Sequence, residues 1–184
     1  MIRAATATDF DAIAAITAHY VERTTIHFAY APPTAAELRA LWQADERHPW
    51  LVTTDDDHDR ATDHAPDAGL SRGAVIGYAK SGAWRTRDAY RWSAEIGIYL
   101  APARRGQGLG RALLAALLAQ MTARGFHAAI AGITMPNPAS VALFEVAGFV
   151  HVGTFREVGW KHDAWHDVGF WQRMLNDHAP SLPG

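Results

Sequence analysis

A glycine-rich turn ahead of a long amphipathic helix pattern is the feature that most constrains how this chain can fold. The turn occupies residues 104–111 (RRGQGLGR), and the helix pattern after it runs from Gly108 to Gly125, a residue suited to ending a helix. Successive small residues let backbone N–H groups converge at a helix N-terminus, where the helix dipole favours an anionic phosphate. Neither a Walker loop nor a dinucleotide fingerprint is present. By itself the turn predicts either a phosphate cradle or a purely structural connection.

The segment before the turn predicts a strand over residues 90–100 with two different faces. Alternate residues of a strand point to opposite sides of a sheet. One face carries only apolar residues and the other a mixed set, namely Ile96, Ile98 and Leu100 against Glu95, Gly97 and Tyr99.

The remaining patterns predict a mixed α/β (α+β) chain. Helices are expected from Thr6 or Thr8 to Tyr20, from the capping box of Thr34 and Glu37 through Trp42, and over residues 138–147. Strands are expected over residues 2–5, 50–54, 74–79, 128–133, 149–155 and 168–175. The helix between residues 100 and 128 supplies the crossover that two parallel strands require.

Length and composition limit the classes of function. The 184 residues fit one domain over residues 1–175, with a mobile loop at about 55–73 and a flexible tail at 176–184. A net charge of −2 gives no electrostatic case for nucleic-acid binding, and no apolar stretch reaches the roughly 20 residues of a membrane span. The lack of cysteine excludes disulfides and thiolate metal sites, and it fits a cytoplasmic protein.

No metal site is expected. The aspartates and histidines of the 55–73 loop show no ligand spacing. His162 and His166 would share a face only in a helix, and the residues around them favour a turn into a strand.

Two blocks of the sequence resemble the GNAT superfamily of acyl-CoA N-acyltransferases. Residues 105–110 match its pyrophosphate signature, and six downstream residues resemble the second half of that signature: Asn137, Ser140, Leu143, Glu145, Gly148 and Phe149. The resemblance implies a mixed, twisted sheet flanked by about four helices, and acetyl-CoA as cosubstrate.

The resemblance narrows to the phosphinothricin acetyltransferases and covers about residues 2–174. It rests on residues 50–52, 82–95 and 135–137 and on the tail block 160–172 (WKHDAWHDVGFWQ). It implies transfer of an acetyl group to the α-amino group of phosphinothricin, methionine sulfoximine, methionine sulfone or a similar compound, by direct attack in a ternary complex. It also implies a homodimer and a link to herbicide or antibiotic resistance.

Several residues receive roles from this resemblance. Glu95 is the candidate general base, since an amine must lose a proton before it attacks a thioester and a carboxylate facing a cleft can accept that proton; its alternative is an ordinary surface glutamate. Phe28, Arg87, Tyr90 and Phe144 are the candidate acceptor-binding residues, whereas Arg85 is expected to be solvated. The candidate coenzyme-binding residues are Ile98, Tyr99, Leu100, Arg105, Gly106, Gln107, Gly108, Leu109, Gly110, Arg111, Asn137 and Ser140.

The chain departs from the family pattern at the candidate residue Phe144 and at Ala29, which follows the candidate residue Phe28. Phe144 stands where many GNAT enzymes have a tyrosine that protonates the departing thiolate and where this branch usually has histidine. Ala29 replaces an arginine common in the resistance enzymes, which removes a cation near the pocket. The thiolate leaves without much help, because a thiol pKa is about 8.5. Acceptor identity is therefore the property most affected.

Two rival functions remain open at this stage. One is an acetyltransferase for protein N-termini or polyamines, although a polyamine needs an acidic pocket and Arg85 with Arg87 oppose that. The other is a CoA-binding regulatory module that has lost turnover, which Phe144 would favour and Glu95 opposes.

Overall fold

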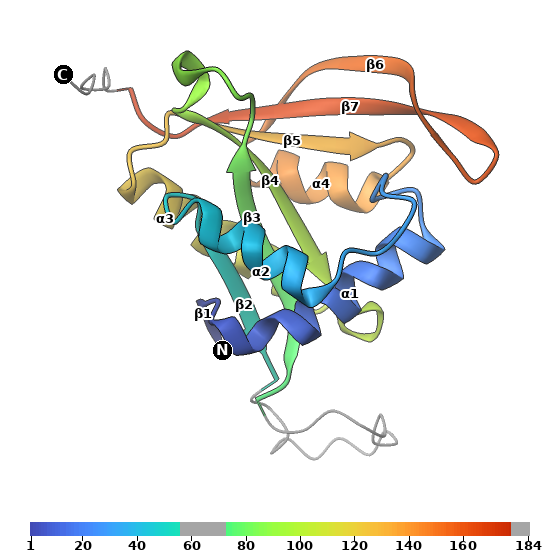
Figure 1. The fold of residues 1–184 in the computed structure, drawn as a ribbon. Helices are drawn as coiled ribbons and strands as arrows, with labels where there is room; N and C mark the ends of the chain where they lie inside the picture. The colour runs from blue at the N-terminus through green and yellow to red at the C-terminus, as the bar shows by residue number, and fades with distance from the viewer. Residues whose placement is uncertain (56–72, 178–184) are drawn as a thin grey trace.

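The computed structural model describes residues 1–55 and 73–177, which form a seven-stranded sheet covered by helices (Figure 1). The strand order is β1-β2-β3-β4-β5-β7-β6, and β4 with β5 is the one parallel pair of neighbours within the described residues. The strands are β1 (Ile2–Ala4), β2 (Trp50–Thr54), β3 (Val75–Ala83), β4 (Ser93–Leu100), β5 (Ala128–Thr134), β6 (Val150–Lys161) and β7 (Ala164–Met174). The predicted mixed fold with a crossover helix is confirmed.

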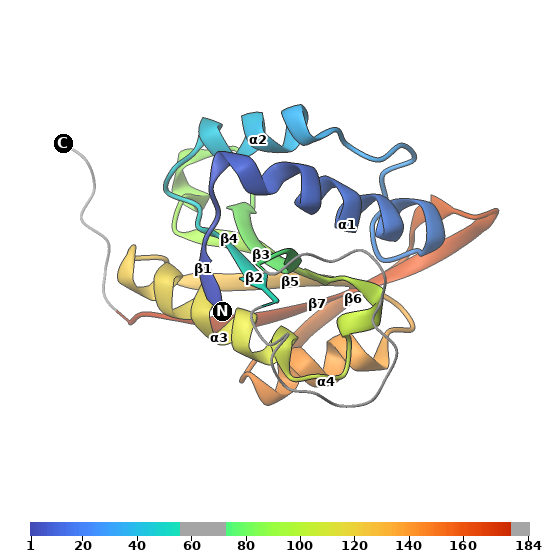
Figure 2. The ribbon, with the colours of Figure 1, turned by 90° about the horizontal axis from the view of Figure 1, so that it is seen from below.

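Two helices lie on each face of the sheet, as Figure 2 shows. Helices α1 (Phe10–Arg23) and α2 (Ala35–Ala44) cover one face, while α3 (Leu109–Ala123) and α4 (Pro138–Val146) cover the other. Each face has its own apolar core. Alternate residues of one strand enter different cores, so Tyr78 packs with α1 and α2 whereas Ala79 packs with α3.

Local sequence signals set several helix ends as predicted. The Thr34 hydroxyl accepts from the Glu37 N–H at 3.2 Å, and the Glu37 carboxylate accepts from the Thr34 N–H at 2.7 Å, which is a complete capping box. Gly125 follows α3 with a φ of 78°. At the first helix, Thr6 caps a short 3-10 turn instead, and α1 itself begins at Phe10.

Strand boundaries differ from the prediction by more than one residue in three places. The strand expected from Tyr90 begins at Ser93, because residues 88–90 form a 3-10 turn. The strand expected over residues 74–79 extends to Ala83. The last two strands are longer than expected and form a hairpin, in which His162 and Asp163 have φ values of 49° and 55°. Positive φ at both central residues is typical of the two-residue turns that suit the twist of a hairpin.

Two predicted segments fall partly beyond the described residues. Residues 56–72 of the expected mobile loop and residues 178–184 of the expected tail lie outside the described part of the chain. Of the helices in the described part, none has the length and apolar character needed to span a bilayer.

Candidate active site

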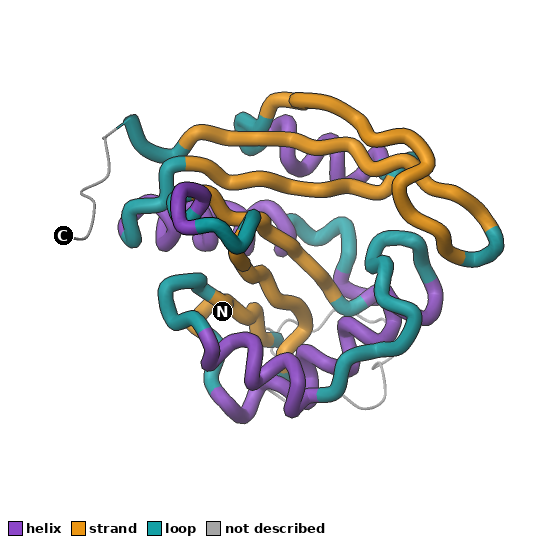
Figure 3. Tube along the Cα trace, turned by 45° about the horizontal axis from the view of Figure 1, so that its top comes forward, coloured by secondary structure: helices purple, strands orange, loops and turns teal. Residues whose placement is uncertain are grey.

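The site lies where the two halves of the sheet separate. β4 pairs with β3 over seven residues but with β5 over only three, and the last of these is Glu95 with Ile130. Beyond Glu95 the strands diverge, as the two groups of orange strands in Figure 3 show. A pocket of about 400 Å³ occupies this region, lined by β4, β5, the segment after α1, α4 and the β6–β7 hairpin.

The separation leaves backbone groups of β4 without a neighbouring strand. The Ala101 N–H donates to the Ile76 carbonyl of β3 at 2.8 Å, and N–H groups along a strand alternate between its two sides. The N–H of Leu100 therefore faces the open side, where it donates to the Tyr20 hydroxyl at 3.2 Å. By the same alternation the Ile98 N–H faces the open side, which is where a donor to an acetyl carbonyl is required.

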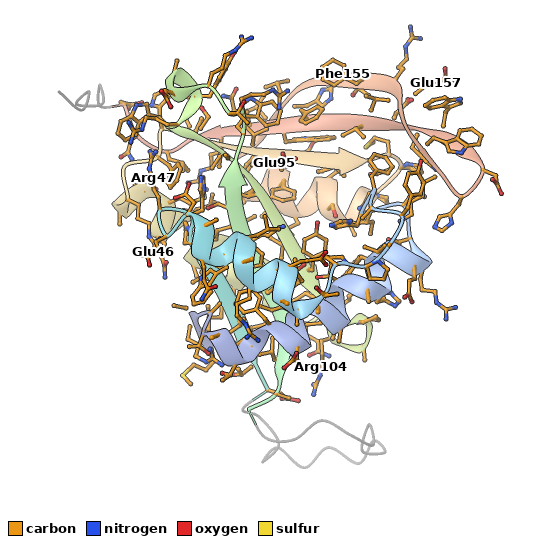
Figure 4. All side chains as sticks on the ribbon, in the orientation of Figure 1. Glu46, Arg47, Glu95, Arg104, Phe155 and Glu157 are labelled. Atoms are coloured by element: carbon orange, nitrogen blue, oxygen red, sulfur yellow. The ribbon has the colours of Figure 1, made fainter. Side chains whose placement is uncertain are left out.

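Glu95 stands at the point of separation, on β4 close to β5 (Figure 4). Its carboxylate leans over Gly132 of β5, since a β-carbon at that glycine would lie 3.3 Å from Oε1. The carboxylate remains open to the pocket, yet burial by surrounding protein raises its pKa above the usual glutamate value. The charges of Arg85 and Lys80 oppose this rise. A carboxylate with a raised pKa is a stronger base, so Glu95 is suited to accept a proton from an amine.

Tyr99 supplies a protonated phenol beside this carboxylate. Its N–H lies on the β3 side by the alternation described above, so Tyr99 contributes its ring to the pocket lining. The ring stacks on Tyr78 with centroids 5.0 Å apart, and it leans over Gly97, where a β-carbon would lie 3.0 Å from Cε2. Burial first, then the charge of Glu95 and the nearby Tyr20, raise the pKa of Tyr99 to about 12. The phenol is therefore a hydrogen-bond donor at neutral pH.

The glycine-rich turn has the geometry that an anion cradle requires. Gly106 and Gly108 have φ values of 77° and 79°, and a β-carbon at either would meet nothing within 4 Å, so their surroundings are open. Gly108 is the N-cap of α3 and makes no side-chain capping bond, which leaves the first amides of the helix available to a ligand. A β-carbon at Gly110 would instead make ordinary van der Waals contact with Leu143 and Leu100. These residues fit a diphosphate group.

Helix α4 brings three predicted residues to the pocket. Asn137, Ser140 and Phe144 all line it. The Asn137 Oδ1 accepts from the Ser140 N–H at 3.1 Å and caps the helix, so the amide nitrogen is what Asn137 offers to a ligand. Phe144 is buried against Phe149, with ring centroids 5.1 Å apart, and presents a hydrocarbon wall.

The predicted acceptor-binding residues divide into two groups. Phe28 lines the pocket, where its ring lies against the backbone of Gly159 so closely that a β-carbon there would be 2.5 Å from it. Arg87 and Tyr90 are exposed in the segment between β3 and β4 and are not among the pocket-lining residues. Arg85, expected to be solvated, is exposed but stacks on Trp84 and acts electrostatically on Glu95.

Two residues near the pocket were not singled out from the sequence. His27 lines the pocket, and Lys80 lies on the same sheet face as Glu95 with its ammonium 4.9 Å from the Trp50 ring centroid. Lys80 could have been identified by its position, because a charged residue directly follows the run of mainly apolar residues 74–79. Nothing in the sequence distinguishes His27.

Of the two hairpin histidines considered for a metal site, His166 has a hydrogen-bond partner within the hairpin. His166 lies on β7, where its Nε2 is 2.8 Å from the Lys161 carbonyl, and His162 lies in the hairpin turn. Across residues 1–55 and 73–177 no three histidine, cysteine or carboxylate side chains are grouped as a metal site would require.

Known proteins share this architecture along almost the whole chain. A family model described as the acetyltransferase (GNAT) family matches residues 35–149. The phosphinothricin N-acetyltransferase of Streptomyces viridochromogenes is 39% identical over 183 residues, which cover 99% of this chain and 91% of that protein. The L-methionine sulfoximine/L-methionine sulfone acetyltransferase of Pseudomonas paraeruginosa is 34% identical, with 99% and 98% covered.

A solved structure agrees with these sequence matches. The crystal structure of a GNAT superfamily phosphinothricin acetyltransferase from Sinorhizobium meliloti, in complex with acetyl-CoA, superposes with a TM-score of 0.86 at 35% identity. The match covers 100% of this chain and 92% of that one. The chain therefore belongs to the GNAT family and is an N-acetyltransferase that uses acetyl-CoA.

Proposed function

We propose that this enzyme acetylates the α-amino group of a small amino-acid-like acceptor such as phosphinothricin, methionine sulfoximine or methionine sulfone. The observation that carries the proposal is Glu95, whose carboxylate leans over Gly132 where β4 and β5 part, on the strand that also carries the open N–H of Ile98. Base and amide donor thus line the same pocket. The names of the two relatives support this class of acceptor.

The chemistry divides among residues of this chain. Glu95 accepts a proton from the acceptor ammonium, so that the amine can attack the thioester carbonyl. The Ile98 N–H stabilises the oxygen on which negative charge develops. The amides of residues 106–111 hold the diphosphate, and Asn137 with Ser140 contacts the pantetheine arm. Phe144 cannot donate a proton, so the sulfur departs as a thiolate, which takes up the second proton that the acceptor nitrogen loses as the amide forms.

The pocket favours a small acceptor over a protein chain. Its volume of about 400 Å³ falls in the range of small-molecule sites. Apolar side chains from the hairpin and the segment after α1 form a large part of its wall: Ile26, Phe28, Phe155, Val158, Val168 and Phe170. A carbon chain of a few atoms can pack on these groups while its amine reaches Glu95. Arg87 and Tyr90 remain proposed for the acceptor's acid group from outside this lining.

A thiol-release assay with acetyl-CoA tests the proposal. Phosphinothricin, methionine sulfoximine, methionine sulfone and simple amino acids are offered to wild-type enzyme and to Glu95→Gln. Turnover on at least one amino-acid-like acceptor is expected, with loss of most of kcat in the variant. Turnover only on peptides with a free N-terminus, or full kcat in the variant across pH 6 to 9, would contradict the proposal.

We further propose that the enzyme is a cytoplasmic homodimer. Seven large apolar side chains of the β6–β7 hairpin are exposed, and five of them lie on the edge strand β6, which is unusual for a strand facing water: Val150, Val152, Phe155, Val158, Trp160, Trp165 and Met174. A second copy would cover those that do not line the pocket, including Val150 and Val152. Light scattering should give twice the monomer mass, and the pair of changes Val150→Glu and Val152→Glu should give the monomer mass; a monomeric wild type would refute the dimer.

A further inference from the structure

His27 lines the pocket, but none of the roles proposed for the pocket residues is assigned to it. It lies between α1 and α2 and lines the pocket together with Glu95 and Tyr99. Its imidazole ring is 6.1 Å from the Tyr99 ring, between centroids, at an angle of 50°. A polar ring is therefore set into a wall that is otherwise formed mainly by aromatic and aliphatic groups.

One hydrogen bond fixes which nitrogen of this ring carries the proton. The Ala29 N–H points at the His27 Nδ1 at 3.2 Å, so Nδ1 acts as an acceptor. A neutral imidazole has one acceptor nitrogen and one donor nitrogen, and Nε2 therefore carries the hydrogen. Within the described part of the chain, the hydrogen bond made by the His27 ring is this one at Nδ1, and Nε2–H is given no protein acceptor. The donor is left for a ligand or for water.

The backbone of His27 is held as firmly as its ring. The Lys161 ammonium at the end of β6 donates to the His27 carbonyl at 2.6 Å and to the Val21 carbonyl in the last turns of α1. This buried ammonium fastens the segment to both the helix and the hairpin. A side chain on a fixed backbone with a fixed tautomer is a preorganised donor.

Burial and two nearby cations disfavour the charged form of the His27 ring. Burial lowers the pKa of His27, and the charges of Lys80 and Lys161 lower it further. Lys80 comes from the strand behind the pocket, where it pairs in register with Gly97 of β4 and Trp50 of β2. Of the described residues that line the pocket, Glu95 and Tyr99 are the other titratable groups, while Tyr20 packs against Tyr99 and His166 against Phe28 from outside the lining. A neutral donor suits an uncharged oxygen, whereas a carboxylate would favour a cation.

We infer that His27 donates its Nε2–H to an oxygen of the acceptor's side-chain head group, such as a sulfonyl or sulfoximine oxygen, and so sets which acceptors the enzyme prefers. The inference rests on the proposed function and adds a specificity-determining residue to it. The amine end of the acceptor is then at Glu95, and the head group lies toward the segment after α1. A site that donates to such an oxygen loses affinity for analogues without it, because the donor is left unpaired.

Methionine sulfone and methionine form the matched acceptor pair, since they differ only in the two sulfonyl oxygens. We compare kcat/KM for both in wild type, His27→Phe and His27→Asn, at saturating acetyl-CoA. In His27→Phe the ratio for sulfone over methionine should fall about 10-fold, mainly through KM of the sulfone, as expected for one lost hydrogen bond in a buried site. His27→Asn keeps an N–H donor and should recover part of that ratio.

Calorimetry of methionine sulfone with CoA-loaded protein provides a readout independent of turnover, and thermal melts show whether each variant is folded. Weaker binding of the sulfone to His27→Phe than to wild type is expected. An unchanged acceptor ratio and unchanged sulfone binding in a folded variant would overturn the inference while leaving the proposed function intact. A wild type that acetylates neither acceptor but acetylates peptides would instead overturn the proposed function.

Discussion

The two faces of the sheet are built from the same strands but hold different chemistry. The face under α3 and α4 is almost entirely apolar, with Leu113, Leu117 and Met121 fully buried against it. The opposite face carries Lys80, Glu95 and Tyr99, whose pKa values are all shifted by burial. One face can therefore stabilise the fold while the other holds costly polar groups close to the pocket.

The largest expected effect is on the polar face. Glu95→Gln removes the proposed base but keeps the size of the side chain, so kcat should fall about 10³-fold. Stability should change little, since Glu95 is open to the pocket and makes no ion pair in the described structure. Steady-state kinetics and thermal melts measure the two quantities.

In the wild type, kcat/KM should rise with pH through a pKa above the usual glutamate value of about 4.3, because burial raises the pKa of Glu95.

A matching change on the apolar face should lower the stability of the protein and leave kcat nearly unchanged. Leu117→Ala leaves a cavity at a fully buried position under α3 and should cost about 3 kcal/mol of unfolding free energy. Its kcat at a temperature where the protein is folded should stay within about threefold of wild type, because Leu117 is not among the residues that line the pocket. Urea unfolding gives the free energy. A loss of kcat as large as that of Glu95→Gln would refute the division between the faces.

A third change tests the glycine-rich turn that precedes α3. Gly108→Ala forces a residue with a β-carbon into a φ of 79°, which costs about 1 kcal/mol. The turn is expected to relax and misdirect its amides, so the affinity for CoA should fall about fivefold. Gly82→Ala is the matched control, since that glycine has no left-handed φ and open space around it. Calorimetric titration with CoA should separate them, and equal affinities would argue against the cradle.

The smallest expected effect concerns Lys80. Lys80→Met removes a positive charge that favours the ionised form of Glu95, so the pKa of Glu95 should rise further. The acid limb of the kcat/KM profile should then move to higher pH, whereas Lys80→Arg should keep it near the wild-type position. An unchanged or acid-shifted limb in a folded Lys80→Met would mean that this charge does not reach the base.

Local features were predictable from the sequence, and those set by strand pairing were not. The capping box of Thr34 and Glu37, the helix end at Gly125 and the two faces of β4 depend on neighbouring residues and were confirmed. The early end of the β4–β5 pairing at Glu95 depends on register between strands far apart in the sequence. Without that register, neither the pocket nor the approach of Lys80 and His27 to it could be derived.

The contact made by Lys161 has a consequence for the order in which the enzyme matures. His27 and Lys161 are 134 residues apart, whereas the glycine-rich turn and α3 are complete by residue 123. During synthesis on the ribosome, the residues of the coenzyme cradle therefore emerge before the hairpin that fastens the acceptor wall. The acceptor wall can be completed only after Lys161 has left the ribosome.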